Sequence, residues 1–259
     1  MVNEARTGGG RAWAVRRDND DTIYVKGAVS GSRLHRYGVG VAQPALLAAG
    51  ALRQALIAEG IMVQGQATVG VTPEDAKLVH RHVSIPMGQM IPKLNQESDN
   101  FFAEHLWKAT VAEVTGKGSY ARGGAASAMF FHDEAGIPYG HLYQFDGSGL
   151  SDTNRTSALA IVKALQYADK QPWSELFHRS LAVAADPDGT MNRLFRGTLA
   201  AGNLHAKTGY IDDVRTLSGY VRARNGERIA FSFLYNGRNT FGARSVQSEL
   251  GELLANYGG

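Results

Sequence analysis

The carboxyl-terminal part of the sequence constrains the fold more than any other part. Three runs typical of strands, Leu204 to Ile211, Arg215 to Ala223 and Arg228 to Tyr235, follow one another with short turns between them. Asn225-Gly226, between the last two runs, is a strong hairpin signal because both residues tolerate the positive φ angles of tight turns. A helix is predicted from about Ala243 to Asn256. The pattern predicts an antiparallel sheet closed by a C-terminal helix.

Helical patterns dominate the middle of the chain. Pro44 to Gly60 carries apolar residues on one face, between a proline at its start and a glycine at its end. A block of helices before an antiparallel sheet is an α+β architecture. The further expected helices are Ser84 to Lys117 (most regular over Asp99 to Val114), Ala125 to Ala135, a helix capped by Thr156 or Ser157, and Pro172 to Phe177.

The remaining segments are expected to form strands or loops. Short β-branched or aromatic runs in the first 43 residues predict strands. Ile61 to Val71 alternates like a strand, whereas His141 to Arg155 is rich in Gly, Ser, Asp and Asn and is predicted to be a loop. The predicted N-terminal strands are AWAV (residues 12–15), TIYVKGAV (22–29) and RYGVGV (36–41).

Composition excludes several classes of function. The chain has no cysteine, which excludes disulfides, thiolate metal sites and a cysteine nucleophile. Its 27 basic and 24 acidic residues are interleaved, without the concentrated basic face of a nucleic-acid-binding protein. No apolar run reaches the roughly 18 residues that a membrane span needs. The first residues contain no apolar stretch typical of a secretory signal, so the chain as given is expected to stay in the compartment where it is made.

Two tripeptides carry the functional signal. Ser98-Asp99-Asn100 lies in NQESDNFFAEHL, and Lys207-Thr208-Gly209 lies in HAKTGYIDDVRTLSGYV. Each tripeptide alone is a weak signal, but both occur in the right order, one at the entry to a predicted helix and one in a predicted strand. Together with S-x-x-K, these elements are the signature of penicillin-binding proteins and serine β-lactamases.

Further segments extend this resemblance. LNQESDNFFAEHL, FDGSGLSDTNRTS, the DPDGT turn after SLAVAA, and AKTGY followed by LSGYV occur in this order. The chain resembles the D-alanyl-D-alanine carboxypeptidase/endopeptidase family of low-molecular-mass penicillin-binding proteins, from about Pro44 to the C-terminus. The resemblance implies a penicillin-binding/β-lactamase-like transpeptidase fold and cleavage of an acyl-D-Ala bond through an acyl-serine intermediate, with no metal and no cofactor.

The resemblance also implies roles for the two motifs. Ser98 would relay protons to the leaving group, and Asn100 would hydrogen-bond the substrate amide. Lys207 would supply a positive field that attracts the terminal carboxylate of the substrate. The implied substrate-binding residues follow it directly in the sequence: the Thr208 hydroxyl, the Gly209 backbone and the Tyr210 backbone N–H, which would form half of the oxyanion hole.

The chain departs from the family pattern at its first motif. No serine is followed three positions later by lysine; Ser30 with Arg33 and Ser119 with Arg122 come closest, and arginine cannot act as a neutral base. In the family, S-x-x-K lies upstream, before inserted β domains. We therefore expect residues 1–43 to be the remnant of an inserted β-rich domain. Residues 44–259 would be the DD-peptidase-like domain, without the acylating serine and two of the family's five sheet strands.

This departure has consequences for partners and location. The strand Arg228 to Tyr235 would present an unpaired edge, so we expect self-association or dependence on a missing N-terminal segment. The resemblance implies that the ligands are peptidoglycan stem peptides ending in D-Ala-D-Ala and β-lactams. It also implies a periplasmic or cell-envelope location.

Several alternatives stay open. A non-catalytic module that binds peptidoglycan peptides or β-lactams fits the same motifs, and so does an esterase or amidase that uses Ser98 or Ser148. Ser148 itself is better explained as a turn residue, because Asp146 stands where a nucleophile elbow requires glycine. His80 and His82 lack a third metal ligand, and a packed strand position explains His205 better than a pH-sensing role.

Overall fold

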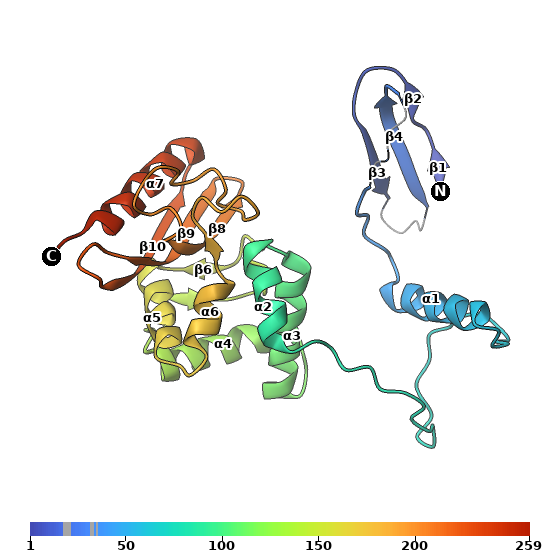
Figure 1. Ribbon diagram of the computed structural model, residues 1–259. Coiled ribbons are helices and arrows are strands. Elements are labelled where there is room, and N and C mark those ends of the chain that lie inside the picture. Colours follow the sequence, from blue (N-terminus) through green and yellow to red (C-terminus); the bar gives the residue numbers. More distant parts are fainter. Residues whose placement is uncertain (18–21, 32–33, 35) are drawn as a thin grey trace. The chain divides into compact units, whose positions relative to one another are not determined.

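The computed structural model describes residues 1–17, 22–31, 34 and 36–259, which form two compact units, Met1–Arg81 and His82–Gly259 (Figure 1). The boundary between the units therefore falls after Arg81, whereas the sequence placed a boundary after residue 43. The interpretation of residues 1–43 as the remnant of an inserted domain stays a prediction.

The first unit contains a small sheet and one helix. Strand β3 (Ala12–Arg16) pairs antiparallel with β4 (Ile23–Val29), which confirms the first two predicted strands. The short strands β1 (Val2–Asn3) and β2 (Arg6–Thr7) pair parallel with β4. Helix α1 (Pro44–Ala58) also forms as predicted, with a proline in its first turn, although none of its residues is buried within the unit.

Two predicted strands are absent from the described part of this unit. Residues 36–41 and residues 61–71 are irregular, so both predictions are wrong. In the second segment Val69 and Val71 are almost fully exposed and pair with no strand. An alternating pattern is stabilised only by a neighbouring strand and a buried face, and this segment has neither.

The second unit begins with two helices that are separated at Ser98. The sequence predicted one helical stretch here, but the structure has α2 (Met87–Gln96) and α3 (Asn100–Thr115). Ser98 has a φ of 58°, a left-handed conformation that ends the first helix. Asp99 then begins the second helix, because its side chain accepts a hydrogen bond from the Phe102 N–H at 3.1 Å.

The other helices of this unit follow the predicted segments with shifted ends. Ser157 caps its helix as predicted and accepts a hydrogen bond from the Ala160 N–H at 3.1 Å. The helix predicted from Ala125 starts earlier because Ser119 caps it. The helices are α4 (Tyr120–Ala135), α5 (Ala158–Asp169), α6 (Ser174–Ser180) and α7 (Thr240–Asn256).

An antiparallel sheet forms the centre of the second unit. The three predicted strands are present as β8 (His205–Ile211), β9 (Val214–Arg222) and β10 (Arg228–Asn236). A fourth strand, β7 (Ala182–Val183), was not predicted because it is only two residues long. The order is β10-β9-β8-β7. The predicted loop 141–155 is mostly irregular, but its ends form a short ladder between β5 (Leu142–Tyr143) and β6 (Arg155–Thr156).

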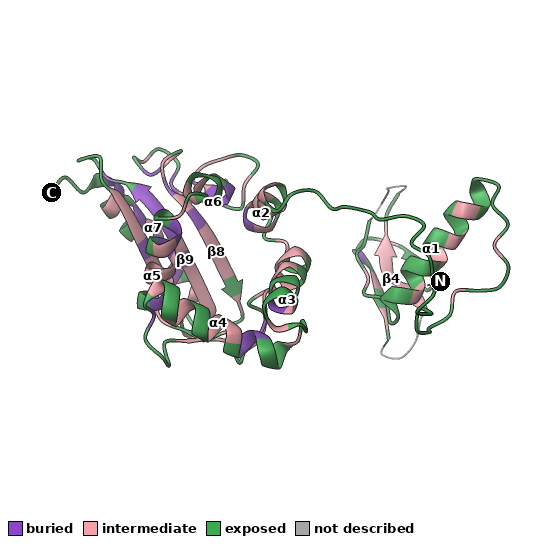
Figure 2. Cartoon of the chain, turned by 90° about the horizontal axis from the view of Figure 1, so that it is seen from below, coloured by how far each residue is buried: buried purple, intermediate pink, exposed green. Residues whose placement is uncertain are grey.

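Helices cover both faces of this sheet, and most buried residues of the chain lie in and around it (Figure 2). On one face, Leu204 and Val221 pack with Ala255 of α7 in the main core. On the other face, Tyr220 of β9 packs with Leu165 of α5, and its O–H donates to the Leu165 carbonyl oxygen at 2.6 Å. The predicted α+β architecture, an antiparallel sheet with a helical block and a C-terminal helix, is therefore confirmed.

None of the helices in the described part of the chain combines the length and the apolarity needed to cross a bilayer.

Candidate functional site

Ser98 and Lys207 are far apart in the sequence but meet in the structure. The Lys207 Nζ donates a hydrogen bond to the Ser98 Oγ at 2.7 Å, across 109 positions of sequence. Ser98 occupies the break between α2 and α3, and β8 carries Lys207 to that break. Left-handed backbone at a residue other than glycine costs of order 1–3 kcal/mol and occurs preferentially at functional sites. The conformation of Ser98 is therefore a second indication that this contact has a function.

Lys207 has no carboxylate partner in the described part of the chain. There its ammonium group donates to two neutral oxygens, the Ser98 Oγ and the Thr208 carbonyl at 2.7 Å. Burial lowers the pKa of Lys207 below its ordinary value. A half-buried ammonium group without a carboxylate partner is a strong attractor for an anionic ligand.

The edge of β8 beyond Ala206 is open to a ligand strand. On one side β8 pairs with β9 along its whole length, from His205 to Ile211. On the other side β7 pairs only with His205 and Ala206, and no further strand of the described chain pairs there. The backbone groups of residues 207–211 on this edge are therefore in position for an added strand.

Asn100 lies close to this site in sequence but faces a different surface. It is the exposed first residue of α3 and has no hydrogen bond to Ser98 or Lys207 in the described structure. Asn100 lines a hollow of about 460 Å³ together with Ser148 and Leu150 of the predicted loop. The structure thus brings Ser98 and Lys207 together, whereas Asn100 lines a hollow that neither of them lines.

The three residues after Lys207 have different surroundings. Thr208 is half-buried, whereas Tyr210 is exposed and its ring lies 4.0 Å from the Arg215 guanidinium carbon. Gly209 packs closely against β9, because a Cβ there would lie 2.3 Å from the Thr216 Oγ1 and would force that side chain to move. Glycine therefore allows close cross-strand packing at this position, in addition to any contact with a ligand.

Comparisons with known proteins agree with these motifs. The profile of the D-Ala-D-Ala carboxypeptidase 3 (S13) family matches residues 7–257. The D-alanyl-D-alanine carboxypeptidase of Actinomadura sp. (strain R39) is 34% identical over 228 residues, which cover 85% of this chain and 42% of that protein. This chain belongs to the S13 carboxypeptidase family. The assignment confirms the resemblance to low-molecular-mass penicillin-binding proteins.

DacB of Haemophilus influenzae matches both by sequence and by structure. The D-alanyl-D-alanine carboxypeptidase DacB is 28% identical over 185 residues, 70% of this chain and 38% of that protein. The crystal structure of penicillin binding protein 4, complexed with a β-lactam, has a TM-score of 0.76 at 24% identity and covers 94% of this chain and 59% of that one. This likeness shows that the S13 chain has the penicillin-binding fold. The chain spans about two fifths of the length of these curated relatives.

The other candidate residues of the S13 chain have no hydrogen bond to Ser98 or Lys207 in the described structure. Ser148 is in the loop after Phe145, and no histidine or lysine of the described chain hydrogen-bonds its hydroxyl. His80 and His82 are exposed, and no cluster of three metal-binding side chains occurs among the described residues.

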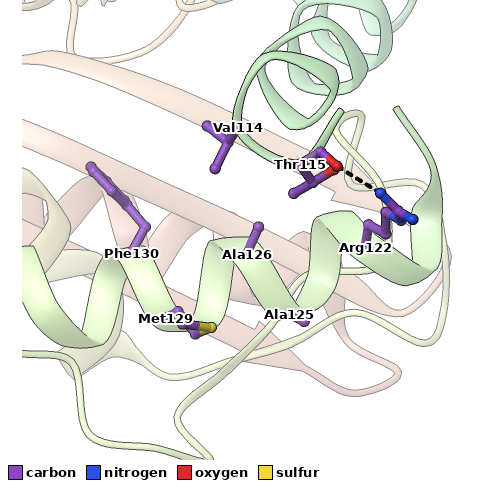
Figure 3. A pocket seen from close by; sticks show the side chains of 7 residues that line it. All are labelled: Val114, Thr115, Arg122, Ala125, Ala126, Met129 and Phe130. Carbon is purple, nitrogen blue, oxygen red and sulfur yellow. Dashed lines mark hydrogen bonds between the residues drawn. The ribbon is translucent and has the colours of Figure 1, made fainter. Parts of the chain in front are cut away.

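A second hollow lies between α3 and α4, with a volume of about 530 Å³ (Figure 3). Its lining is mostly apolar and includes Val114, Met129 and Phe130. At one end the Arg122 side chain donates to the Thr115 carbonyl oxygen at 2.6 Å. None of the predicted site residues lines this hollow.

His178 is a residue near the site that the sequence patterns did not reveal. It lies on α6, and its ring stacks on His205 of β8 with centroids 4.1 Å apart. This contact makes His205 a packed strand residue, two positions before Lys207. Burial is the main cause that lowers the pKa of both histidines, and for His178 the neighbouring His205 and Arg228 add to it. No local sequence signal marks His178, because it pairs with His205 only through tertiary packing.

The histidine pair predicts that stability falls at acidic pH. Both pKa values are lower in the folded chain than the ordinary value of about 6.5. Below about pH 6.5 the unfolded chain therefore binds more protons than the folded chain. The contribution of the two neutral histidines to the free energy of unfolding is complete above about pH 6.5, and it is lost as the pH falls from there through their lowered pKa values. We expect the urea concentration at the midpoint of unfolding to be lower at pH 5 than at pH 8.

The same measurement on two variants tests the cause. His178→Phe should reduce the difference between the two midpoints, whereas His105→Phe at an exposed position should preserve it. An unchanged pH difference in His178→Phe would assign the acid sensitivity to other groups.

Proposed function

We propose that this chain forms the substrate-anchoring part of a serine-type D-Ala-D-Ala carboxypeptidase/endopeptidase that acts on peptidoglycan stem peptides and binds β-lactams. The acylating serine of S-x-x-K is not in this sequence and would come from outside it. The observation that carries the proposal is the 2.7 Å hydrogen bond from the Lys207 Nζ to the Ser98 Oγ, beside the open edge of β8. The names of the S13 relatives support it.

In this proposal the open strand edge holds the substrate. The peptide lies along residues 207–211 as an added strand, and Lys207 attracts its terminal carboxylate. The Thr208 hydroxyl donates to the same carboxylate. Gly209 keeps the strand flat enough for a close approach, and the Tyr210 N–H contributes half of the oxyanion hole.

Ser98 and Asn100 serve the reaction itself. After an external serine attacks the scissile carbonyl, the departing amine needs a proton. The attacking serine would give its hydroxyl proton to the lysine of S-x-x-K, and Ser98 would relay a proton from that lysine to the amine, giving its own hydroxyl proton and taking one in return. The Lys207 ammonium group donates a hydrogen bond to the Ser98 Oγ, holds this hydroxyl in place and stays protonated. Asn100, two positions after Ser98 at the start of α3, hydrogen-bonds the amide of the substrate.

The proposal extends to location and association. A protein that acts on peptidoglycan would be located in the periplasm or cell envelope. Strand β10 is nine residues long and pairs on one side with β9, with no second neighbour in the described chain. Such an edge supports self-association or pairing with an N-terminal segment. A monomer in light scattering at high concentration would contradict self-association.

A second candidate is a module that binds these ligands without hydrolysing them. The absence of a serine followed three positions later by lysine favours it. A third candidate is an esterase or amidase in which Ser98 is itself the nucleophile; Lys207 would then have to be neutral and take the Ser98 hydroxyl proton, and burial lowers the pKa of Lys207 in that direction. The three possibilities differ in whether the chain forms a covalent bond with a β-lactam, and at which residue.

Intact mass spectrometry with excess benzylpenicillin tests the proposal. We expect a complex under native conditions and no adduct after denaturation. An adduct that survives denaturation would show that this chain contains a nucleophile, and peptide mapping would assign it to Ser98, Ser148 or another residue. If neither a native complex nor a covalent adduct is detected, the proposed function of this chain fails.

A further inference from the structure

Glu104 connects the helix that carries Asn100 to the loop of residues 145–154. It lies on α3, one helical turn after Asn100. Its Oε2 accepts two backbone hydrogen bonds, from the Gly147 N–H at 3.0 Å and the Ser148 N–H at 3.2 Å. One carboxylate oxygen therefore holds two consecutive peptide groups of a segment more than 40 positions away.

The loop is also fixed internally. The buried Asp146 accepts hydrogen bonds from the Gly149 N–H and the Ser151 N–H, both at 2.7 Å. Asn154 donates to the same carboxylate at 3.0 Å and accepts from the Phe145 N–H at 2.7 Å. These hydrogen bonds fix the shape of the loop, so its position on the unit depends on its attachment to the helix.

That attachment is tight. A Cβ at Gly147 would lie 2.5 Å from the Ala103 carbonyl oxygen and 2.6 Å from the Trp107 Cβ, so the loop backbone rests directly on α3. Only a residue without a side chain fits there. Glu104 supplies the polar partners that this close contact would otherwise leave unsatisfied.

The loop and the helix both line one hollow. The loop contributes Ser148 and the exposed Leu150, and α3 contributes Asn100 and Glu104 itself, to the hollow of about 460 Å³. The shape of this surface beside Asn100 is therefore set by how the loop sits on the helix.

We propose that Glu104 is a positioning residue that sets ligand selectivity at this wall. It acts through Gly147 and Ser148, and it holds Leu150 at a fixed place beside Asn100. The ligand group in contact with this wall is the acyl portion that precedes the D-Ala-D-Ala terminus, or the acyl side chain of a penicillin. This inference rests on the proposed function for the identity of the ligand, and on the hydrogen bonds alone for the positioning.

Lys108 balances the negative charge of Glu104. The Lys108 Nζ lies 3.6 Å from the Oε1, one turn further along the helix, and also lies 4.0 Å from the centre of the Tyr120 ring. The Oε1 is buried and has no hydrogen bond, so both backbone donors depend on the Oε2. A glutamine keeps an oxygen acceptor for them, whereas an alanine leaves both N–H groups without a partner.

Hydrogen exchange and ligand binding test the positioning role. In Glu104→Ala, amide exchange in residues 145–154 should accelerate about tenfold or more, and exchange in β8 should stay unchanged. Glu104→Gln should restore most of the protection. Glu113→Ala, at an exposed position of the same helix, is the control and should exchange like the unmodified chain.

Two penicillins, one with and one without an acyl side chain, then distinguish a change in selectivity from a general loss of binding. Glu104→Ala should weaken binding of benzylpenicillin about fivefold or more, and leave binding of the unacylated penicillin nucleus unchanged, because only the first carries the acyl side chain. Equal losses for both ligands, or unchanged exchange in the loop, would overturn the inference. If the unmodified chain binds neither penicillin, the proposed function fails, and the positioning of the loop is decided by the exchange measurement.

Discussion

Lys207→Ala should weaken binding of benzylpenicillin to this chain by about tenfold or more. The substitution removes the half-buried ammonium group that donates to the Ser98 Oγ and that we propose attracts the carboxylate of the ligand. A hydrogen bond to a charged group contributes about 1.5–3 kcal/mol, which corresponds to roughly a tenfold to hundredfold change in the dissociation constant. Titration by native mass spectrometry measures this constant directly.

Two further variants make the result specific. Lys170→Ala removes an exposed lysine after α5 and should leave the dissociation constant unchanged, which controls for net charge. In an enzyme where this chain is joined to S-x-x-K, Lys207→Ala and Ser98→Ala should each reduce acylation by penicillin more than tenfold. Unchanged labelling in both variants would refute the assigned site.

Gly219→Ala should cause the largest loss of stability among single-methyl changes in the sheet. A Cβ at Gly219 would lie 2.1 Å from the His205 carbonyl oxygen and 2.6 Å from the Ala206 Cα. Both are backbone atoms of β8, so β8 itself must move away from β9. Overpacking in a core costs about 1–3 kcal/mol, and we expect the upper end of that range or more because no side-chain rotation relieves the contact.

The free energy of unfolding in urea measures this loss. Gly189→Ala is the matched control, since its added Cβ would lie 3.8 Å from its nearest neighbour, an ordinary van der Waals distance. A Gly219→Ala chain as stable as this control would mean that β8 and β9 can separate at little cost. In that case the position of Lys207, on the same strand, would also be less rigidly held than we infer.

The two residues of the candidate site, Lys207 and Ser98, are held by packing at different places. Lys207 is held by the sheet, through pairing of β8 with β9. Ser98 is held by α2, where the buried Asn95 donates to the Ser180 Oγ of α6 at 2.8 Å. The stacked pair of His178 and His205 joins α6 to β8 directly. We therefore expect changes at this pair to affect the packing around both Lys207 and Ser98.

The sequence by itself determined the elements with strong local signals. The Asn225-Gly226 turn, the alternating runs of β8 to β10 and the side-chain cap at Ser157 depend on a few neighbouring residues, and all are present in the structure. The motifs at Ser98 and Lys207 were sufficient to indicate the family, which the S13 profile confirms. Local signals failed where no neighbour stabilised them, as in the irregular segment 61–71.

Only the tertiary structure decided which of these residues meet. The left-handed backbone at Ser98, its contact with Lys207 across 109 positions, and the stacking of His178 on His205 leave no mark on local patterns. The same holds for Glu104, whose partners lie on a distant loop. The physical reason is that backbone propensity and periodicity act over a few residues. The distance between two side chains on different elements is set by how the helices pack on the sheet.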